Sequence, residues 1–192
     1  MIITLTGPSG VGKTTIFGQL LRELPNFRLV SSHTTRQPRE SDLPGEYKYY
    51  TDQEFEVMRS GVTPLWDHEF SGFQYLTSAE SVLETSQHPN SIFGMLLIPS
   101  VIGRLKSFAE LRGIQVMSVY ILSPASDVLS ARMAGRGESP ESIQRRIDLS
   151  KSWDADAGPS GLYEYFITNN GSIDEAVQKV IDIIEENQPY LG

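Results

Sequence analysis

Nine residues near the N-terminus combine the residue types that bind phosphate. Residues 7–15 read GPSGVGKTT, and the first eight match the pattern G-x-x-x-x-G-K-[ST] in full. Glycines let a loop wrap around an anion with its backbone N–H groups pointing inward, and the following helix adds the positive end of its dipole. The pattern predicts a triphosphate-binding loop that includes Ser9, Gly10, Val11, Gly12, Lys13, Thr14 and Thr15. Lys13 would reach the β- and γ-oxygens, and the Thr14 hydroxyl would ligate Mg²⁺.

A second group of anion-binding side chains lies further along the chain. Residues 31–39 read SSHTTRQPR and place Arg36 and Arg39 three positions apart, beside four residues with hydroxyl groups. Arginine binds phosphate through a planar fork of N–H donors, so this stretch indicates an oxyanion site. The alternative for this stretch is an exposed loop with two solvated arginines. The alternative for GPSGVGKTT is a strand-to-helix turn that binds nothing, although the apolar residues before it and the helical pattern after it favour the phosphate site.

Composition excludes several classes of function. The chain has 192 residues, with 16 Lys and Arg against 24 Asp and Glu, which gives a net charge of −8. Such an acidic protein is a poor general binder of nucleic acid or of an anionic membrane. The absence of cysteine excludes disulfides and thiolate metal sites. No signal peptide and no run of roughly 18 apolar residues is present, so we expect a cytoplasmic protein.

Short apolar stretches alternate with helical patterns, and this positions both phosphate sites. We expect strands at 1–6, 27–32, 91–98, 115–122 and 165–168. We expect helices at about 14–24, 51–59, 101–112 and 126–134, and helices that start near 139 and 172. Thr51 with Glu54, and Thr77 with Glu80, have the spacing of capping boxes. The alternation predicts an α/β fold with a central parallel sheet, which a polar, tyrosine-bearing region at 34–84 interrupts.

Beyond these patterns, the sequence resembles the guanylate kinases over nearly its whole length. SSHTTRQPR and PGEYKYY resemble the segments that hold the acceptor's phosphate in that family, SGFQYLT resembles its G-N-Y-Y-G-[TS] segment, and ARMAGRG with ESIQRRI resembles its lid. The resemblance implies an acceptor site made of Ser32, Arg36, Arg39, Asp42, Tyr47, Tyr75 and Thr77. It also implies lid arginines at Arg132, Arg136 and Arg146. Asn169, in the loop TNNGS, falls where the family holds adenine, although this loop also reads as a simple turn.

The resemblance implies a P-loop NTPase fold, with a five-stranded parallel sheet flanked by helices, a small monophosphate-binding subdomain and a lid. In this chain the core would span about 1–33 and 85–192, the acceptor-binding subdomain about 34–84 and the lid about 135–150. The implied activity is transfer of a phosphoryl group from ATP, with Mg²⁺, to GMP or dGMP. Lys13, Arg36 and the three lid arginines would supply the countercharge. The implied partner is a small nucleotide, bound by a monomer or a homodimer, with no nucleic acid or membrane involved.

The sequence departs from the family pattern in three respects. The glutamate that reads guanine is replaced by Trp66, or by Leu65 if the tryptophans are aligned. The strand that carries a D-x-D pair in the family has no Asp or Glu here, because none occurs between Glu84 and Glu110. Asp42 stands where the family usually has glutamate, and one residue is missing before Tyr47.

These departures leave the acceptor open, because a lost contact to the substrate relaxes or changes specificity. A kinase of the same fold that acts on ribose 1,5-bisphosphate is one alternative, since those relatives also lack the D-x-D pair. A non-catalytic interaction module of the scaffold-protein type is another, but such modules typically degrade the phosphate loop, and GPSGVGKTT is complete.

Overall fold

A five-stranded parallel sheet forms the centre of the protein. The computed structural model describes residues 1–70, 72–135, 139–170 and 172–187. The strand order is β2-β7-β1-β8-β9, and all four neighbouring pairs are parallel. The strands are β1 (Ile2–Thr6), β2 (Phe27–Leu29), β7 (Ile92–Leu97), β8 (Val116–Leu122) and β9 (Tyr165–Thr168). The predicted α/β class and five-stranded parallel sheet are confirmed.

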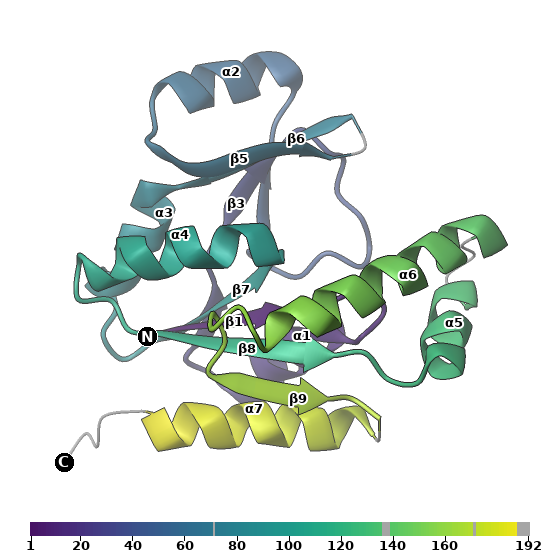
Figure 1. The fold of residues 1–192 in the computed structure, drawn as a ribbon. Coiled ribbons are helices and arrows are strands. Elements are labelled where there is room, and N and C mark those ends of the chain that lie inside the picture. Colours follow the sequence, from purple (N-terminus) through teal and green to yellow (C-terminus); the bar gives the residue numbers. More distant parts are fainter. Residues whose placement is uncertain (71, 136–138, 171, 188–192) are drawn as a thin grey trace.

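Helices cover both faces of this sheet (Figure 1). On one face α1 (Lys13–Glu23) packs against α7 (Ile173–Asn187), and both contribute to one apolar core. On the other face α4 (Pro99–Glu110) contributes to a second core. Helices α5 (Ser126–Ala134) and α6 (Pro140–Ala157) pack against each other beside the loop that precedes α1; α5 adds buried residues to the first core, and α6 adds buried residues to both. Strands buried on both faces read as continuous apolar runs, which is why residues 91–98 lack alternation. No described helix has the length and apolar character to cross a bilayer.

A second, four-stranded sheet is built by residues between β2 and β7. Its order is β4-β3-β6-β5, with β3 parallel to β4 and the other pairs antiparallel. The strands are β3 (Ser32–Thr34), β4 (Tyr47–Tyr49), β5 (Pro64–Phe70) and β6 (Phe73–Ser78). Helix α2 (Asp52–Ser60) follows β4 and begins with the predicted capping box of Thr51 and Glu54. Figure 1 shows this sheet and α2 on the α4 side of the molecule, and α3 (Ala79–Leu83) with a short 3₁₀ turn, η1 (Glu84–Gln87), leads back to β7.

Four of the predicted elements need corrected bounds. The strand expected at 27–32 ends at Leu29, and the chain then enters the second sheet at Ser32. The helix expected from 101 begins at Pro99, which can occupy a first helical position because it needs no N–H partner there. The strands expected at 91–98 and 115–122 are each slightly shorter, whereas 126–134 and 165–168 are confirmed.

The capping box expected from Thr77 and Glu80 does not form. Ser78 caps α3 instead, and its hydroxyl accepts a hydrogen bond from the Ser81 N–H at 3.1 Å. The Glu80 carboxylate accepts from the Thr63 N–H, and Thr77 stays in β6. The helix cap therefore lies one residue later than predicted, at Ser78, and Thr77 remains part of β6.

Candidate active site

The phosphate loop occupies the connection between β1 and α1, and its glycines are required by its shape. Gly7, Gly10 and Gly12 have φ angles of 143°, 84° and 102°. A Cβ on Gly7 would lie 2.3 Å from the Ile121 carbonyl oxygen, and one on Gly12 would lie 2.6 Å from the Asn169 amide nitrogen. Only glycine tolerates both the positive φ and these approaches. Gly12 also has no side chain to cap α1, so the first N–H groups of the helix stay open to an anion.

Lys13 folds back across this loop. Its ammonium group donates to the carbonyl oxygens of Gly7 at 2.6 Å and Pro8 at 2.7 Å. Thr14 and Thr15 follow in the first turn of α1, and both are exposed. The loop therefore presents one ammonium group, two hydroxyl groups and the open end of a helix within a single turn of chain.

Side chains from distant parts of the sequence reach the same loop. Arg146 of α6 donates to the Ser9 hydroxyl at 2.6 Å. The buried Asn169 amide donates to the Val11 carbonyl at 3.0 Å, and Arg132 donates to the Asn169 carbonyl at 3.2 Å. Arg132 Nη1 and Asn169 Oδ1 are buried without a hydrogen-bond partner. Buried polar atoms of this kind are costly unless a ligand or water satisfies them.

A second cationic centre lies beside the smaller sheet, around Arg36 in the loop between β3 and β4. Its side chain is buried, and Nη2 contacts the Asp42 carboxylate at 2.8 Å. Asp42 also accepts from the Arg39 N–H at 2.7 Å and from the Tyr49 hydroxyl at 2.8 Å. Burial opposes the charge of Asp42, but the hydrogen bonds from Arg36, Arg39 and Tyr49 outweigh it and lower the pKa of the carboxyl group. Arg36 is therefore held in one orientation, whereas the Arg39 side chain is exposed.

Aromatic and hydroxyl side chains surround Arg36. Its guanidinium carbon lies 5.2 Å from the centre of the Tyr47 ring, and the Tyr75 ring meets Tyr47 edge-on at 6.0 Å. Ser32 and Thr77 share a hydrogen bond of 2.7 Å between their hydroxyl groups. Four of the predicted acceptor residues therefore lie on the second sheet, at Ser32, Tyr47, Tyr75 and Thr77, and Arg36 and Asp42 lie beside it in the loop between β3 and β4. The Arg39 side chain is exposed on the same loop.

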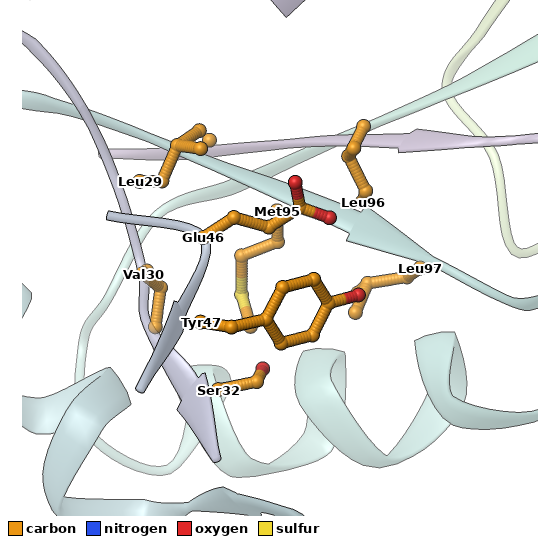
Figure 2. A pocket seen from close by; sticks show the side chains of 9 residues that line it. Leu29, Val30, Ser32, Glu46, Tyr47, Met95, Leu96 and Leu97 are labelled. Carbon is orange, nitrogen blue, oxygen red and sulfur yellow. The ribbon is translucent and has the colours of Figure 1, made fainter. Parts of the chain in front are cut away.

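A small cavity joins the second sheet to the central sheet. It has a volume of about 20 Å³, which is room for about one water molecule. Ser32, Glu46 and Tyr47 line it from one side, and β7 lines it from the other with apolar side chains (Figure 2). Leu97 at the end of β7 pairs in register with Thr6, the residue before the phosphate loop. Strand β7 therefore connects the lining of this cavity with the strand that leads into the phosphate loop.

Comparison with known proteins identifies the family. A family model described as Guanylate kinase matches residues 1–187. The guanylate kinase of Prochlorococcus marinus (strain MIT 9312) is 34% identical over 187 residues, which covers 96% of each chain. That of Desulfitobacterium hafniense (strain Y51) is 33% identical and covers 96% of this chain and 88% of the relative. The chain belongs to the guanylate kinase family. Guanylate kinases are nucleoside monophosphate kinases, so this chain is an enzyme of that class.

Solved structures support the fold assignment. The crystal structure of guanylate kinase from Anaplasma phagocytophilum has a TM-score of 0.67 at 21% identity and covers all of this chain and 87% of that one. A shikimate kinase from Acinetobacter baumannii, in complex with shikimate, has a TM-score of 0.51, also at 21% identity, and covers 97% of this chain and 94% of that one. This chain therefore has the P-loop kinase fold of the guanylate kinase family.

Apolar side chains stand where the resemblance led us to look for the family's acids. The two positions that the sequence offers for the guanine-reading glutamate are both apolar: Trp66 is only 4% exposed and packs in the second core, and Leu65 packs against that core. Strand β7, for which the resemblance implied an acid pair, presents Met95, Leu96 and Leu97 to the cavity. Arg136, the third lid arginine expected from the family, lies outside the described residues.

Nothing in the sequence was a reason to single out Tyr49, His68 or Glu46, and each of them lies beside a predicted acceptor residue. Tyr49 binds Asp42, and burial, followed by its contact with Asp42, raises the pKa of Tyr49 to about 12. His68 stacks on Tyr75 with ring centres 5.3 Å apart and an angle of 10°. Glu46 lines the cavity. The alternation Tyr47–Lys48–Tyr49 signals a strand with both tyrosines on one face, but neither Glu46 nor His68 has a local signal.

Proposed function

We propose that this chain transfers the γ-phosphoryl group of ATP to the phosphate of a nucleoside monophosphate, with GMP or dGMP as the preferred acceptor. The observation that carries the proposal is the complete phosphate loop at the start of α1, together with a separate buried guanidinium, Arg36, that Asp42 holds in place. Two anion sites in one chain suit a reaction in which one phosphate attacks another.

On the donor side, ATP would bind at residues 9–15. The loop glycines leave room for a phosphate, and Lys13 and the open end of α1 supply positive charge. Arg132 Nη1 is an unsatisfied donor that suits an anionic oxygen, and Asn169 Oδ1 is an unsatisfied acceptor that suits an amino group such as that of adenine.

Mg²⁺ fits the donor set at the start of α1. The exposed Thr14 hydroxyl would hold it, together with phosphate oxygens and water, because Mg²⁺ keeps several waters in such sites. Among the described residues no group of three or more His, Asp or Glu could hold a metal, so phosphate oxygens would provide the anionic ligands. When bound, the ion neutralises charge on the β- and γ-phosphates.

On the acceptor side, Arg36 and Arg39 would bind the monophosphate, with Tyr47 and Tyr75 beside it. Arg36 is already fixed by Asp42, so it need not lose side-chain freedom when the phosphate arrives. Ser32 and Thr77 would offer hydroxyl groups to the rest of the acceptor. Asp42 would act by positioning Arg36, because Arg36, Tyr49 and the Arg39 N–H already occupy its oxygens.

The lid would close over the donor and supply arginines to the transition state. Arg146 at Ser9 and Arg132 at Asn169 are the described groups that support this role. The division into a core, an acceptor-binding subdomain at about 34–84 and a lid at about 135–150 belongs to the same proposal. Charge spreads over the equatorial oxygens during phosphoryl transfer, so nearby guanidinium groups accelerate it, and closure excludes water.

Ribose 1,5-bisphosphate is the second candidate acceptor, and the apolar end of β7 favours it. Met95, Leu96 and Leu97 offer no carboxylate for a base, and buried Trp66 offers none either. An acceptor without a base needs neither acid. The two candidates share the phosphate site at Arg36 and differ in what fills the remaining space.

A coupled assay of ADP release tests the proposal. The panel is GMP, dGMP, AMP, CMP, UMP and ribose 1,5-bisphosphate, each with ATP and Mg²⁺. Stimulation by GMP or dGMP is expected, whereas a response to the sugar phosphate alone would select the second candidate. ATP binding without stimulation by any acceptor would overturn catalysis and point to an interaction module. In addition, R36A should weaken acceptor binding much more than ATP binding, and equal losses would contradict the acceptor assignment.

A further inference from the structure

Glu46 brings a carboxylate to a place where the neighbouring strand offers only apolar side chains. It lies directly before β4 and lines the cavity together with Tyr47 and Leu96. Figure 2 shows its side chain extending from the β4 segment toward the central sheet, away from Ser32. Strand β7 contributes Met95, Leu96 and Leu97 to the same cavity. Glu46 is the acidic residue in the lining of this cavity.

The environment of Glu46 makes its charge costly. Burial is the largest influence and raises the pKa of the carboxyl group, and the nearby charge of Asp42 raises it as well. Hydrogen bonds from the Leu43 N–H and the Tyr47 hydroxyl, and the charge of Arg36, act in the opposite direction without cancelling the effect of burial. A buried carboxylate is unfavourable unless it is well satisfied, so a functional contact would explain why an acid stands here.

The carboxylate retains capacity for further hydrogen bonds. Its two oxygens offer about four acceptor sites, and the Leu43 N–H, at 3.1 Å from Oε2, and the Tyr47 hydroxyl account for part of that capacity. Asp42, the acid nearest to Arg36, is already used by Arg36, Arg39 and Tyr49. Of these two acids, Glu46 is the one with acceptor sites to spare beside the cavity.

The charges around Glu46 restrict what it can bind. A carboxylate repels phosphate, and the Arg36 guanidinium beside Tyr47 attracts it. An acceptor in this site would therefore place its phosphate toward Arg36 and a hydrogen-bond donor toward Glu46. Donors next to a nucleotide's phosphate are the hydroxyl groups of its sugar and the N–H groups of its base.

We propose that Glu46 is a specificity-determining residue that accepts a hydrogen bond from a hydroxyl or N–H group of the phosphate acceptor. The inference rests on the proposed function, because it assumes that a monophosphate binds at Arg36. It assigns to the loop before β4 a recognition role that β7 and Trp66 cannot perform in this chain. It also sets the orientation of the bound acceptor, because the phosphate faces the positive Arg36 and the hydrogen-bond donor faces the negative Glu46.

Calorimetric titration of E46Q tests this proposal without depending on turnover. The matched control is E40Q, which removes the charge of the exposed Glu40 from the same loop. An amide oxygen in E46Q can still accept from the Leu43 N–H, so the turn should be retained, and thermal unfolding of each variant checks this. We expect E46Q to bind GMP about ten- to hundredfold more weakly, which is the range for a hydrogen bond to a charged group. ATP affinity in E46Q and GMP affinity in E40Q should not change.

Acceptors that lack one donor identify the group. The titration is repeated with dGMP, which lacks the 2′-hydroxyl, and with IMP, which lacks the 2-amino group. If E46Q weakens GMP but not dGMP, the donor is the sugar hydroxyl, and if it weakens GMP but not IMP, the donor is the amino group. Equal weakening of all three still supports the inference and assigns another donor common to them.

Two results would overturn the inference while leaving the proposed function intact. One is wild-type GMP affinity in a folded E46Q protein. The other is a loss of Mg²⁺-dependent ATP binding with unchanged GMP binding, which would make Glu46 part of the metal site. If the wild-type protein binds ribose 1,5-bisphosphate and no nucleotide, E46Q is judged on that sugar phosphate by the same criterion. If the wild-type protein binds none of these acceptors, the proposed function itself fails, and the inference fails with it.

Discussion

Arg36 and Asp42 form an ion pair of 2.8 Å in which the two side chains are 6% and 12% exposed. The pair is largely buried, and the Arg36 guanidinium also lies over the ring of Tyr47, which lines the cavity. Such an arrangement fixes the direction of the guanidinium before any ligand arrives. Removing one partner from a buried pair is far more damaging than removing both, because the remaining charge is left without compensation.

The variant D42N should therefore lose both stability and acceptor affinity. Arg36 keeps its charge but loses the carboxylate that orients it, which should cost about 3 kcal/mol of unfolding free energy. Urea denaturation measures the stability, and calorimetry measures GMP and ATP binding separately. D182N, which alters an exposed acid on α7, is the control and should behave as the wild-type protein. A D42N protein with normal acceptor affinity would contradict the positioning role of Asp42.

Replacement of Glu46 should have the opposite effect on stability. Burial raises the pKa of this carboxyl group above its ordinary value of 4.5, so the folded state binds a proton more readily than the unfolded state does. The charged form is therefore destabilising at neutral pH, and E46Q should unfold at a higher temperature than the wild-type protein. As the pH falls through the raised pKa toward 4.5, the wild-type protein gains relative stability and the difference should shrink. Melting temperatures of both proteins between pH 7 and pH 4 provide the measurement, and a constant difference would argue against a buried charge at this position.

Two adjacent arginines in α6 provide a matched pair for the catalytic role. Arg146 donates to the Ser9 hydroxyl in the phosphate loop, whereas Arg145 is exposed and donates to the Glu141 carbonyl within its own helix. R146A should lower kcat by about 10³- to 10⁵-fold, the range for an arginine that stabilises the phosphoryl-transfer transition state. R145A should leave kcat unchanged. Steady-state rates of ADP release decide the comparison, and similar rates in both variants would remove Arg146 from the transition state.

Asn169 and Asn170 allow the same kind of comparison at the donor site. The Asn169 amide holds the Val11 carbonyl and is buried, whereas Asn170 is exposed. N169A should weaken ATP binding by about tenfold or more, because it removes one hydrogen bond from the loop and leaves a buried carbonyl oxygen unsatisfied. GMP binding should be unchanged, and N170A should match the wild-type protein for both ligands. Equal effects of the two variants on ATP affinity would show that the loop does not depend on Asn169.

The sequence predicted the donor side of this protein better than the acceptor side. The phosphate loop depends on glycines and a lysine at fixed spacing, and the strands around it are continuous apolar runs, so both signals are local. Strand β9 and helix α5 match their predicted bounds for the same reason.

The smaller sheet was harder to predict. Strands β3 and β4 have three residues each and carry polar or aromatic side chains, so no apolar run marks them. The parallel pairing of Ser32 with Tyr47 is a tertiary relationship, as is the contact of Arg36 with Asp42. Glu46 illustrates the limit most clearly, because nothing in PGEYKYY distinguishes an acid at a cavity from an acid in solvent.

The contact between Asn169 and Val11 has a consequence for biosynthesis, because it joins positions 158 residues apart in the sequence. A growing polypeptide on the ribosome exposes residues 7–15 long before β9 has been translated. Until β9 has been translated and has paired with β8, the Val11 carbonyl lacks the hydrogen bond from the Asn169 amide. The nascent chain should therefore gain its affinity for ATP only after β9 has been translated, which makes nucleotide capture a sign that the central sheet has been completed.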